Sequence, residues 1–141
     1  MVILAVDLGA ARTGLAVSDK GESFAFPRGI IKEYNKEKLY QKIAEKAKEE
    51  SAELIVIGLP KNMDGSEGFK AQESYEAADK IKELTGLGVE LWDERCTTIS
   101  AHQSLSMNGI ETKKRKNVVD SVAATIILED YLRFRKSQNS N

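Results

Sequence analysis

The stretch "VILAV", Val2 to Val6, predicts a strand that is buried on both faces. It is short, continuous and rich in β-branched residues, as expected at the centre of a sheet that helices cover on both sides. A second run of this kind, "ELIVIGL" at 53–59, follows "KEKLYQKIAEKAKEE" at 36–50, whose spacing of apolar residues predicts an amphipathic helix. A crossover helix returns the chain in the same direction, so we expect the two buried strands to pair in parallel.

The other elements complete a mixed sheet. Two strands follow the first buried run at close range and are separated by the turn-like "KGES", which predicts antiparallel pairing. Pro27 favours an edge position for the second of them. The order β-β-β-α-β-α-β-α predicts an α/β fold with a mixed five-stranded sheet, three antiparallel strands followed by two parallel strands, flanked by helices. These further elements are strands over 13–19, 25–34 and 88–92 and helices over 69–84 and about 118–135.

Composition limits the possible classes of protein. The 141 residues, 41% hydrophobic and 30% charged, suffice for one packed core, so we expect a single domain over 1–141. Twenty-one basic and twenty-two acidic side chains give a net charge of -1, so any affinity for nucleic acid must come from a local patch. Cys96 is the one cysteine, which excludes internal disulfides and fits a reducing compartment. No apolar run approaches a membrane span or a signal peptide, so we expect a cytoplasmic protein without a membrane partner.

Acidic residues follow two of the three strands that are expected to be parallel. Asp7 follows the first buried run, and Asp93 and Glu94 follow the strand that ends at Trp92. The ends of these strands meet at the edge where open α/β sheets bind ligands. A single Asp after a strand is more often a turn residue, which remains the alternative for Asp7. Adjacent residues of an extended segment point to opposite sides, so only one of Asp93 and Glu94 can face a shared site.

Asp120 is a third acidic candidate, near the start of the last predicted helix. Asn117 is a plausible N-cap, and Asp120 would then close a capping box. At about 100° per residue, however, Asp120 shares a stripe with the apolar Ala124, Ile127 and Tyr131. A carboxylate on the core side of a helix is costly to bury unless a positive charge lies opposite.

A shared divalent cation would offset this cost for three acids together. Hard ions such as Mg²⁺ bind carboxylates, water and substrate phosphate, and the sequence has no cluster of His or Cys that would suggest zinc. We therefore expect Asp7, Glu94 and Asp120 to hold Mg²⁺ or Mn²⁺.

Polar and basic residues near these acids are candidate contacts to a phosphate backbone. "GAARTG" at 9–14 brackets an arginine with glycines, although any hairpin turn can hold glycines. "PKNMDGSEG" at 60–68 is a polar loop on the same edge, with an ordinary surface loop as the alternative. "KKRK" is expected in a loop before the last helix, and such runs are usually only solvated. The predicted substrate contacts are Arg12, Lys61, Asn62, Arg95, Lys113, Lys114, Arg115 and Lys116.

Four stretches of the chain closely resemble the signature blocks of the YqgF family, nucleases of the ribosomal RNA precursor that are also called Holliday-junction-resolvase-like proteins. The resemblance implies a ribonuclease H-like fold, an active site at Asp7, Glu94 and Asp120, and processing of the 5′ end of pre-16S ribosomal RNA. The four stretches are "VDLGAARTGLAVSD", "VIGLPKNMDGSEG", "DERCTT" and "KKRKNVVDSVAATIILEDYL".

The chain departs from the pattern of true junction resolvases of this fold. Such resolvases carry one more acid on the second buried strand and one in the last helix, and Gly58 or Leu59 and Ala123 stand there instead. A resolvase also needs a two-fold dimer, whereas the charged helix faces here favour a monomer, with a dimer as the alternative. We therefore expect a metal-dependent nuclease acting on precursor ribosomal RNA. The alternatives are a Holliday junction resolvase and a catalytically weak RNA-binding module of the same fold.

Overall fold

The computed structural model describes residues 1–9, 11–59, 69–93 and 112–139, with only the backbone described at 69–70, 112–121 and 139. The order of elements is the predicted β-β-β-α-β-α-β-α. The bounds of the elements are β1 Ile3–Asp7, β2 Arg12–Ser18, β3 Ala25–Lys32, α1 Lys36–Glu49, β4 Leu54–Leu59, α2 Phe69–Thr85, β5 Gly88–Asp93 and α4 Thr112–Asn139.

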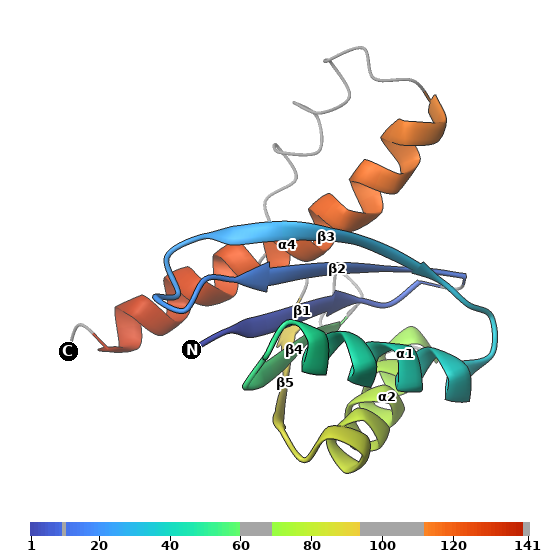
Figure 1. The fold of residues 1–141 in the computed structure, drawn as a ribbon, viewed down its shortest axis with the longest axis horizontal. Helices are drawn as coiled ribbons and strands as arrows, with labels where there is room; N and C mark the ends of the chain where they lie inside the picture. The colour runs from blue at the N-terminus through green and yellow to red at the C-terminus, as the bar shows by residue number, and fades with distance from the viewer. Residues whose placement is uncertain (10, 60–68, 94–111, 140–141) are drawn as a thin grey trace.

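The strands form one five-stranded sheet in the order β3-β2-β1-β4-β5 (Figure 1). The pairs β1–β2 and β2–β3 are antiparallel, and the pairs β1–β4 and β4–β5 are parallel. The predicted mixed sheet is therefore confirmed. Pro27 lies in β3, an edge strand, where the missing N–H costs least.

Helices cover the sheet on both sides. α1 and α2 lie on one face, called here the α1–α2 face, and α4 lies on the other, the α4 face (Figure 1). Strand alternation divides β1 between two apolar clusters: Leu4 and Val6 pack on the α1–α2 face, and Ile3 and Ala5 on the α4 face. All four side chains are fully buried, as the continuous apolar run predicts.

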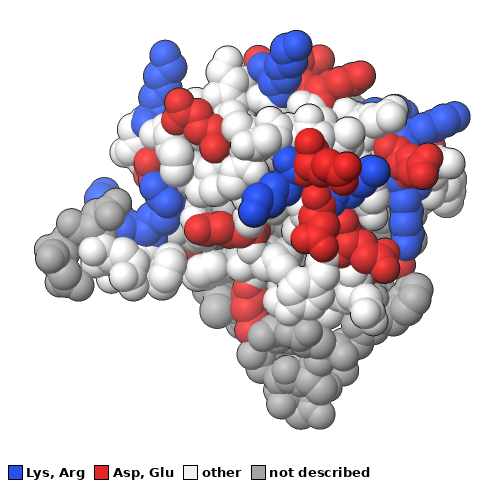
Figure 2. Space-filling model, turned by 90° about the horizontal axis from the view of Figure 1, so that it is seen from below, with Lys and Arg blue, Asp and Glu red and all other residues white. Residues whose placement is uncertain are grey.

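Small residues let α4 come close to the first three strands. Ala5 and Ala16 are register partners on β1 and β2, and Ala124 of α4 packs in the same cluster. All three are fully buried, while Ile127 and Leu128 fill the space beside them. The outer surface of α1 and α2, by contrast, carries acidic and basic side chains intermixed (Figure 2).

α4 begins earlier than its sequence predicts. It starts at Thr112, so the expected start near Val118, the loop over 113–116 and the N-cap at Asn117 are wrong. The apolar stripe begins near Val118, but the helix extends further toward the N-terminus. Lys and Arg are good helix formers, and no Gly or Pro lies between Thr112 and Val118 to stop the helix. The helices of the described ranges include none with the length and apolar character needed to cross a membrane.

Candidate active site

Asp7 ends β1 at the predicted ligand-binding edge of the sheet. Its backbone pairs with Gly14 of β2, and its side chain is half-buried. Because side chains alternate along a strand, Asp7 lies on the same face as Ile3 and Ala5, which is the α4 face. The carboxylate therefore lies on the side of the sheet on which α4 packs.

Glycines flank Asp7 on both neighbouring strands. Gly14 is its register partner on β2, and Gly58 follows Ile57, the register partner of Val6, on β4. By alternation Gly58 lies on the α4 face as well, since Val56 does. At this level of the sheet the strands next to Asp7 therefore contribute backbone alone, which leaves the carboxylate unobstructed by side chains of β2 and β4.

Asp93 lies on the opposite face from Asp7. Trp92, the preceding residue of β5, packs on the α4 face, where its ring meets Tyr131 edge-on at a centroid distance of 5.7 Å. Leu91 packs on the α1–α2 face, and alternation places Asp93 there with it. Glu94 lies outside the described residues.

α4 presents the predicted stripe to the sheet. Ala124, Ile127 and Tyr131 are exposed by 0%, 2% and 3%, respectively, and all belong to the α4-face cluster. Asp120 lies one helical turn before Ala124 and continues this stripe by spacing. Its side chain lies outside the description.

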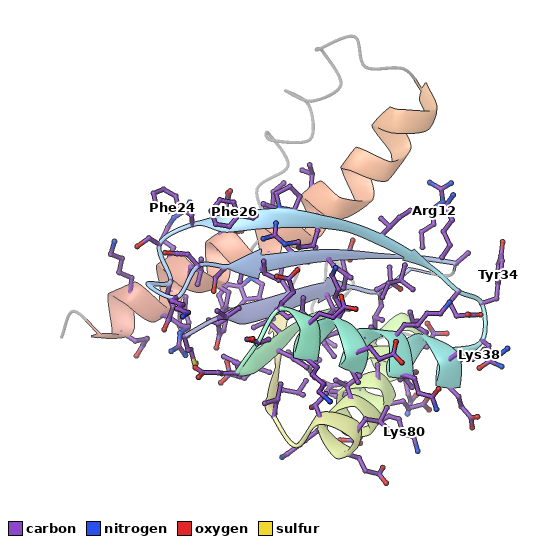
Figure 3. The ribbon with its side chains drawn as sticks, viewed as in Figure 1. Arg12, Phe24, Phe26, Tyr34, Lys38 and Lys80 are labelled. Carbon is purple, nitrogen blue, oxygen red and sulfur yellow. The ribbon has the colours of Figure 1, made fainter. Side chains whose placement is uncertain are left out.

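Arg12 begins β2 immediately after the β1–β2 turn. It is two residues from Gly14, so alternation places it on the α4 face, and Figure 3 shows its side chain pointing away from α1 and α2. The preceding turn is tight, because a Cβ added at Gly9 would lie 2.1 Å from the carbonyl oxygen of Arg12. The tight turn alone therefore explains the glycine at position 9, and no contact with a phosphate is needed to explain it.

The other seven predicted contacts lie outside the described side chains. Four of the predicted site residues lie outside the described residues, namely Glu94, Lys61, Asn62 and Arg95. Lys113 to Lys116 lie in the first turns of α4, where only the backbone is described. Sequence reasoning did not single out Lys32, which is the register partner of Arg12 across the β2–β3 pair. Lys32 is recognised as a neighbour of Arg12 only when the register of the β2–β3 hairpin is known, and the sequence does not reveal that register.

Asp7 is a suitable ligand for a divalent metal. Among the described side chains no three His, Cys, Asp or Glu residues are grouped as metal ligands, and Asp7 is the one predicted ligand in that set. A half-buried carboxylate at a strand end, flanked by glycines, offers the hard oxygen donor that Mg²⁺ prefers. The donor chemistry of Asp7 therefore fits such an ion.

Sequence comparison identifies relatives over almost the whole chain. A family model described as "RuvX: Holliday junction resolvase" matches residues 1–134. A protein of Clostridium botulinum (strain Eklund 17B / Type B) named "Putative pre-16S rRNA nuclease" is 41% identical over 132 residues, covering 94% of this chain and 96% of that protein. A protein of Protochlamydia amoebophila with the same name is 40% identical over 140 residues, covering 94% and 93%, respectively.

Solved structures share the fold at low sequence identity. RuvC of T. thermophilus, in complex with a Holliday junction substrate, superposes with a TM-score of 0.62 at 14% identity, covering 95% of this chain and 96% of that one. The fowlpox virus Holliday junction resolvase gives a TM-score of 0.56 at 15% identity, covering 94% and 99%. The fold and the family matches define a nuclease with a ribonuclease H-like fold. The chain therefore belongs to the RuvX family, which is another name for the YqgF family. The predicted membership of this family is confirmed.

Proposed function

We propose that this chain is a magnesium-dependent nuclease that processes the 5′ end of the pre-16S ribosomal RNA. Membership of the family supports nuclease activity, and the names of its relatives support this substrate. The structural observation that carries the proposal is that Asp7 ends β1 on the α4 face, on which Ala124 and Ile127 of α4 also pack, and that position 120 precedes Ala124 by one helical turn. Acids from two distant segments would then approach one edge of the sheet.

In the proposed site Asp7, Glu94 and Asp120 hold Mg²⁺ or Mn²⁺. The position of Asp93 on the opposite face supports the choice of Glu94 over Asp93. When bound, the metal would activate the attacking water and stabilise charge on the leaving oxygen. Arg12 contributes a guanidinium that clamps and orients the phosphate. The further contacts proposed for the RNA backbone are Lys61, Asn62, Arg95 and Lys113 to Lys116.

The proposal also covers the state in which the protein works. We place it in the cytoplasm, as one nuclease domain over 1–141 that takes part in ribosome biogenesis as a monomer. The cut of one RNA strand needs one site per molecule, whereas symmetric resolution needs two. Acidic and basic side chains are also intermixed on the outer surface of α1 and α2, whereas the interfaces of stable dimers are substantially apolar (Figure 2).

Cleavage of a pre-16S fragment that carries its 5′ leader tests the proposal. Asp7→Asn should abolish cleavage in Mg²⁺ and Mn²⁺, and Glu94→Gln and Asp120→Asn should do the same. Asp93→Asn is the matched control and should retain most activity, because Asp93 lies on the α1–α2 face. Asp7→Asn should also weaken Mn²⁺ binding measured by calorimetry, and its thermal stability without metal should be at or above that of the wild type, since repulsion between acids is relieved.

Two results would contradict these roles. Cleavage retained by Asp7→Asn would remove Asp7 from the site, and loss of activity in Asp93→Asn with retention in Glu94→Gln would reverse the choice between the two neighbours. A wild-type protein that binds the RNA but never cuts it would favour the RNA-binding module.

A further inference from the structure

Arg12 and Lys32 form a pair of like charges across two antiparallel strands. They are register partners at the end of the β2–β3 pair, and cations directly opposite each other destabilise a sheet. Lys32 is exposed and forms no ion pair with any residue of the described part of the chain. Two cations that lie side by side at the end of a strand pair are well placed to bind an anion from outside the protein.

The pair lies on the same face as Asp7. Register partners of an antiparallel pair point to the same side, and Ile31, next to Lys32, packs on the α1–α2 face. Lys32 and Arg12 therefore lie on the α4 face. Because Arg12 is two residues from Gly14, the register partner of Asp7, the two cations lead from the carboxylate toward the sheet edge at β3.

Tyr34 continues this line beyond the end of β3. It is 84% exposed, and Figure 3 shows it at the same end of the sheet as Arg12, with both side chains pointing away from α1 and α2. The backbone on both sides of it is fixed. The N–H of Glu33 donates to the carbonyl of Ala11 at 3.0 Å, and Asn35 caps α1 by accepting from the N–H of Lys38 at 3.0 Å.

An exposed aromatic ring on an ordered backbone, close to two cations, is the combination that binds single-stranded nucleic acid. Bases stack on aromatic side chains, while Arg and Lys follow the phosphates. Because the backbone on both sides of Tyr34 is already ordered, stacking of a base costs mainly the freedom of one side chain. A base in a continuous duplex has no free face, so such a ring favours an unpaired strand.

We propose that Arg12, Lys32 and Tyr34 form a subsite for the single-stranded RNA that flanks the cut, with a phosphate between the two cations and an unpaired base on Tyr34. This inference rests on the proposed function and deepens it. It makes Lys32 and Tyr34 positioning residues, which hold the strand in the direction that leads to Asp7.

Equilibrium binding of a labelled single-stranded leader RNA to the full chain, in EDTA so that no cleavage occurs, tests the subsite. Tyr34→Ala should weaken binding about 10-fold, and Tyr34→Phe, which keeps the ring, should bind as the wild type does. Lys32→Ala should lower the slope of log K against log salt by ~0.7, the loss of one phosphate contact on a single strand. A 2-aminopurine base at the stacked position should be quenched by the wild type and not by Tyr34→Ala.

Two matched controls lie away from the proposed line. Phe24, at the other end of β3, is 66% exposed, and the side chain of Lys80 on α2 is 48% exposed (Figure 3). Phe24→Ala and Lys80→Ala should change neither the affinity nor the salt slope.

The subsite is overturned if Tyr34→Ala binds the single strand as tightly as the wild type. It is overturned equally if Phe24→Ala has the same effect, or if Tyr34→Ala weakens binding of a matched RNA duplex to the same extent. Each of these results leaves the proposed function standing if the wild type still cleaves the precursor in Mg²⁺. A wild type that neither binds nor cleaves the RNA rejects both.

Discussion

Thr13 is a polar residue whose side chain is buried in β2. It is 1% exposed, and within the described ranges its Oγ1 has no partner. A buried hydroxyl that has lost its water costs about 1–3 kcal/mol. Ser18 in the same strand is different, because its Oγ accepts from the N–H of Ile3 at 2.9 Å and donates to the carbonyl of Asp19 at 3.0 Å.

Thr13→Val should therefore raise the free energy of unfolding by about 1 kcal/mol, because it keeps the shape of the side chain and removes the hydroxyl. Urea denaturation followed by circular dichroism measures this change. Ser18→Ala is the control and should lower the free energy of unfolding, because it leaves the N–H of Ile3 without its partner. Equal destabilisation by the two substitutions would mean that Oγ1 of Thr13 is satisfied.

Individual residues also mark how much of the candidate site the sequence can predict. Asp7 could be chosen because it directly follows a run that must be a buried strand. The face on which Asp7 and Asp93 lie could not be derived, because it depends on which side of the sheet each apolar neighbour packs. Lys32 was missed for a related reason, since its partnership with Arg12 depends on the register of a hairpin with a shift between Gly14 and Ala16.

Among the elements, α4 is tied to the β2–β3 turn by an ion pair between Arg135 and Glu22. Nε of Arg135 donates to Oε1 of Glu22 at 2.7 Å, and both side chains are about three-quarters buried, with exposures of 26% and 23%, respectively. The Arg135 hydrogen bond lowers the pKa of Glu22 below its ordinary value. A carboxyl whose pKa is lowered by folding stabilises the native state above its unfolded pKa, and this contribution is lost as the pH falls through the folded value.

Glu22→Gln should lower the free energy of unfolding by about 1–2 kcal/mol at pH 7. The difference from the wild type should shrink as the pH falls below the ordinary pKa of glutamate. Urea titrations at a series of pH values measure it. Glu83→Gln is the control, because Glu83 is 74% exposed and its contact with Lys80 is 3.9 Å long, and it should change little. If the difference in free energy of unfolding between Glu22→Gln and the wild type stayed constant down to acid pH, the ionised form of Glu22 would not be the source of the stabilisation.

The early start of α4 changes what its basic residues can do. Lys113 to Lys116 are consecutive residues of a helix and are therefore spread around its axis, so one RNA strand can meet only some of them. Cations in a first turn also oppose the helix dipole.

Replacement of all four residues by alanine should reduce the slope of log K against log salt for RNA binding by ~1.4, which corresponds to the loss of two phosphate contacts. A loop that follows the RNA backbone with all four residues would instead lose ~2.8. An unchanged slope would mean that the run is only solvated.

The sequence predicted most elements well, and the exception has a physical cause. α1 and α2 were placed within one residue of their ends, because a periodic apolar face faces the core for the whole length of each helix. The first turns of α4 precede its apolar stripe, so the hydrophobic pattern carries no information about them. Helix propensity alone distinguishes that stretch from a loop, and propensity is a weak signal.

For the molecule as a whole, the choice between RNA processing and junction resolution depends on symmetry. Purified protein should cut the precursor RNA in Mg²⁺ or Mn²⁺ in preference to a four-way DNA junction, and it should do so at concentrations where light scattering shows a monomer. The two substrates should be compared at equal strand concentration, with Asp7→Asn as the blank. Paired symmetric nicks in the junction, with the RNA untouched, would establish the resolvase alternative.

The packing of α4 on β1, β2 and β3 also affects how the chain folds during synthesis. The hairpin strands are made first, but Ile3, Ala5 and Ala16 on one of their faces are covered by a helix that is made last. Until Leu132 has left the ribosome, that apolar face has no native partner. The nascent chain therefore cannot complete its core segment by segment. The last part of the core forms only through contacts between residues that are far apart in the sequence, and contacts of this kind slow folding relative to a chain of local contacts.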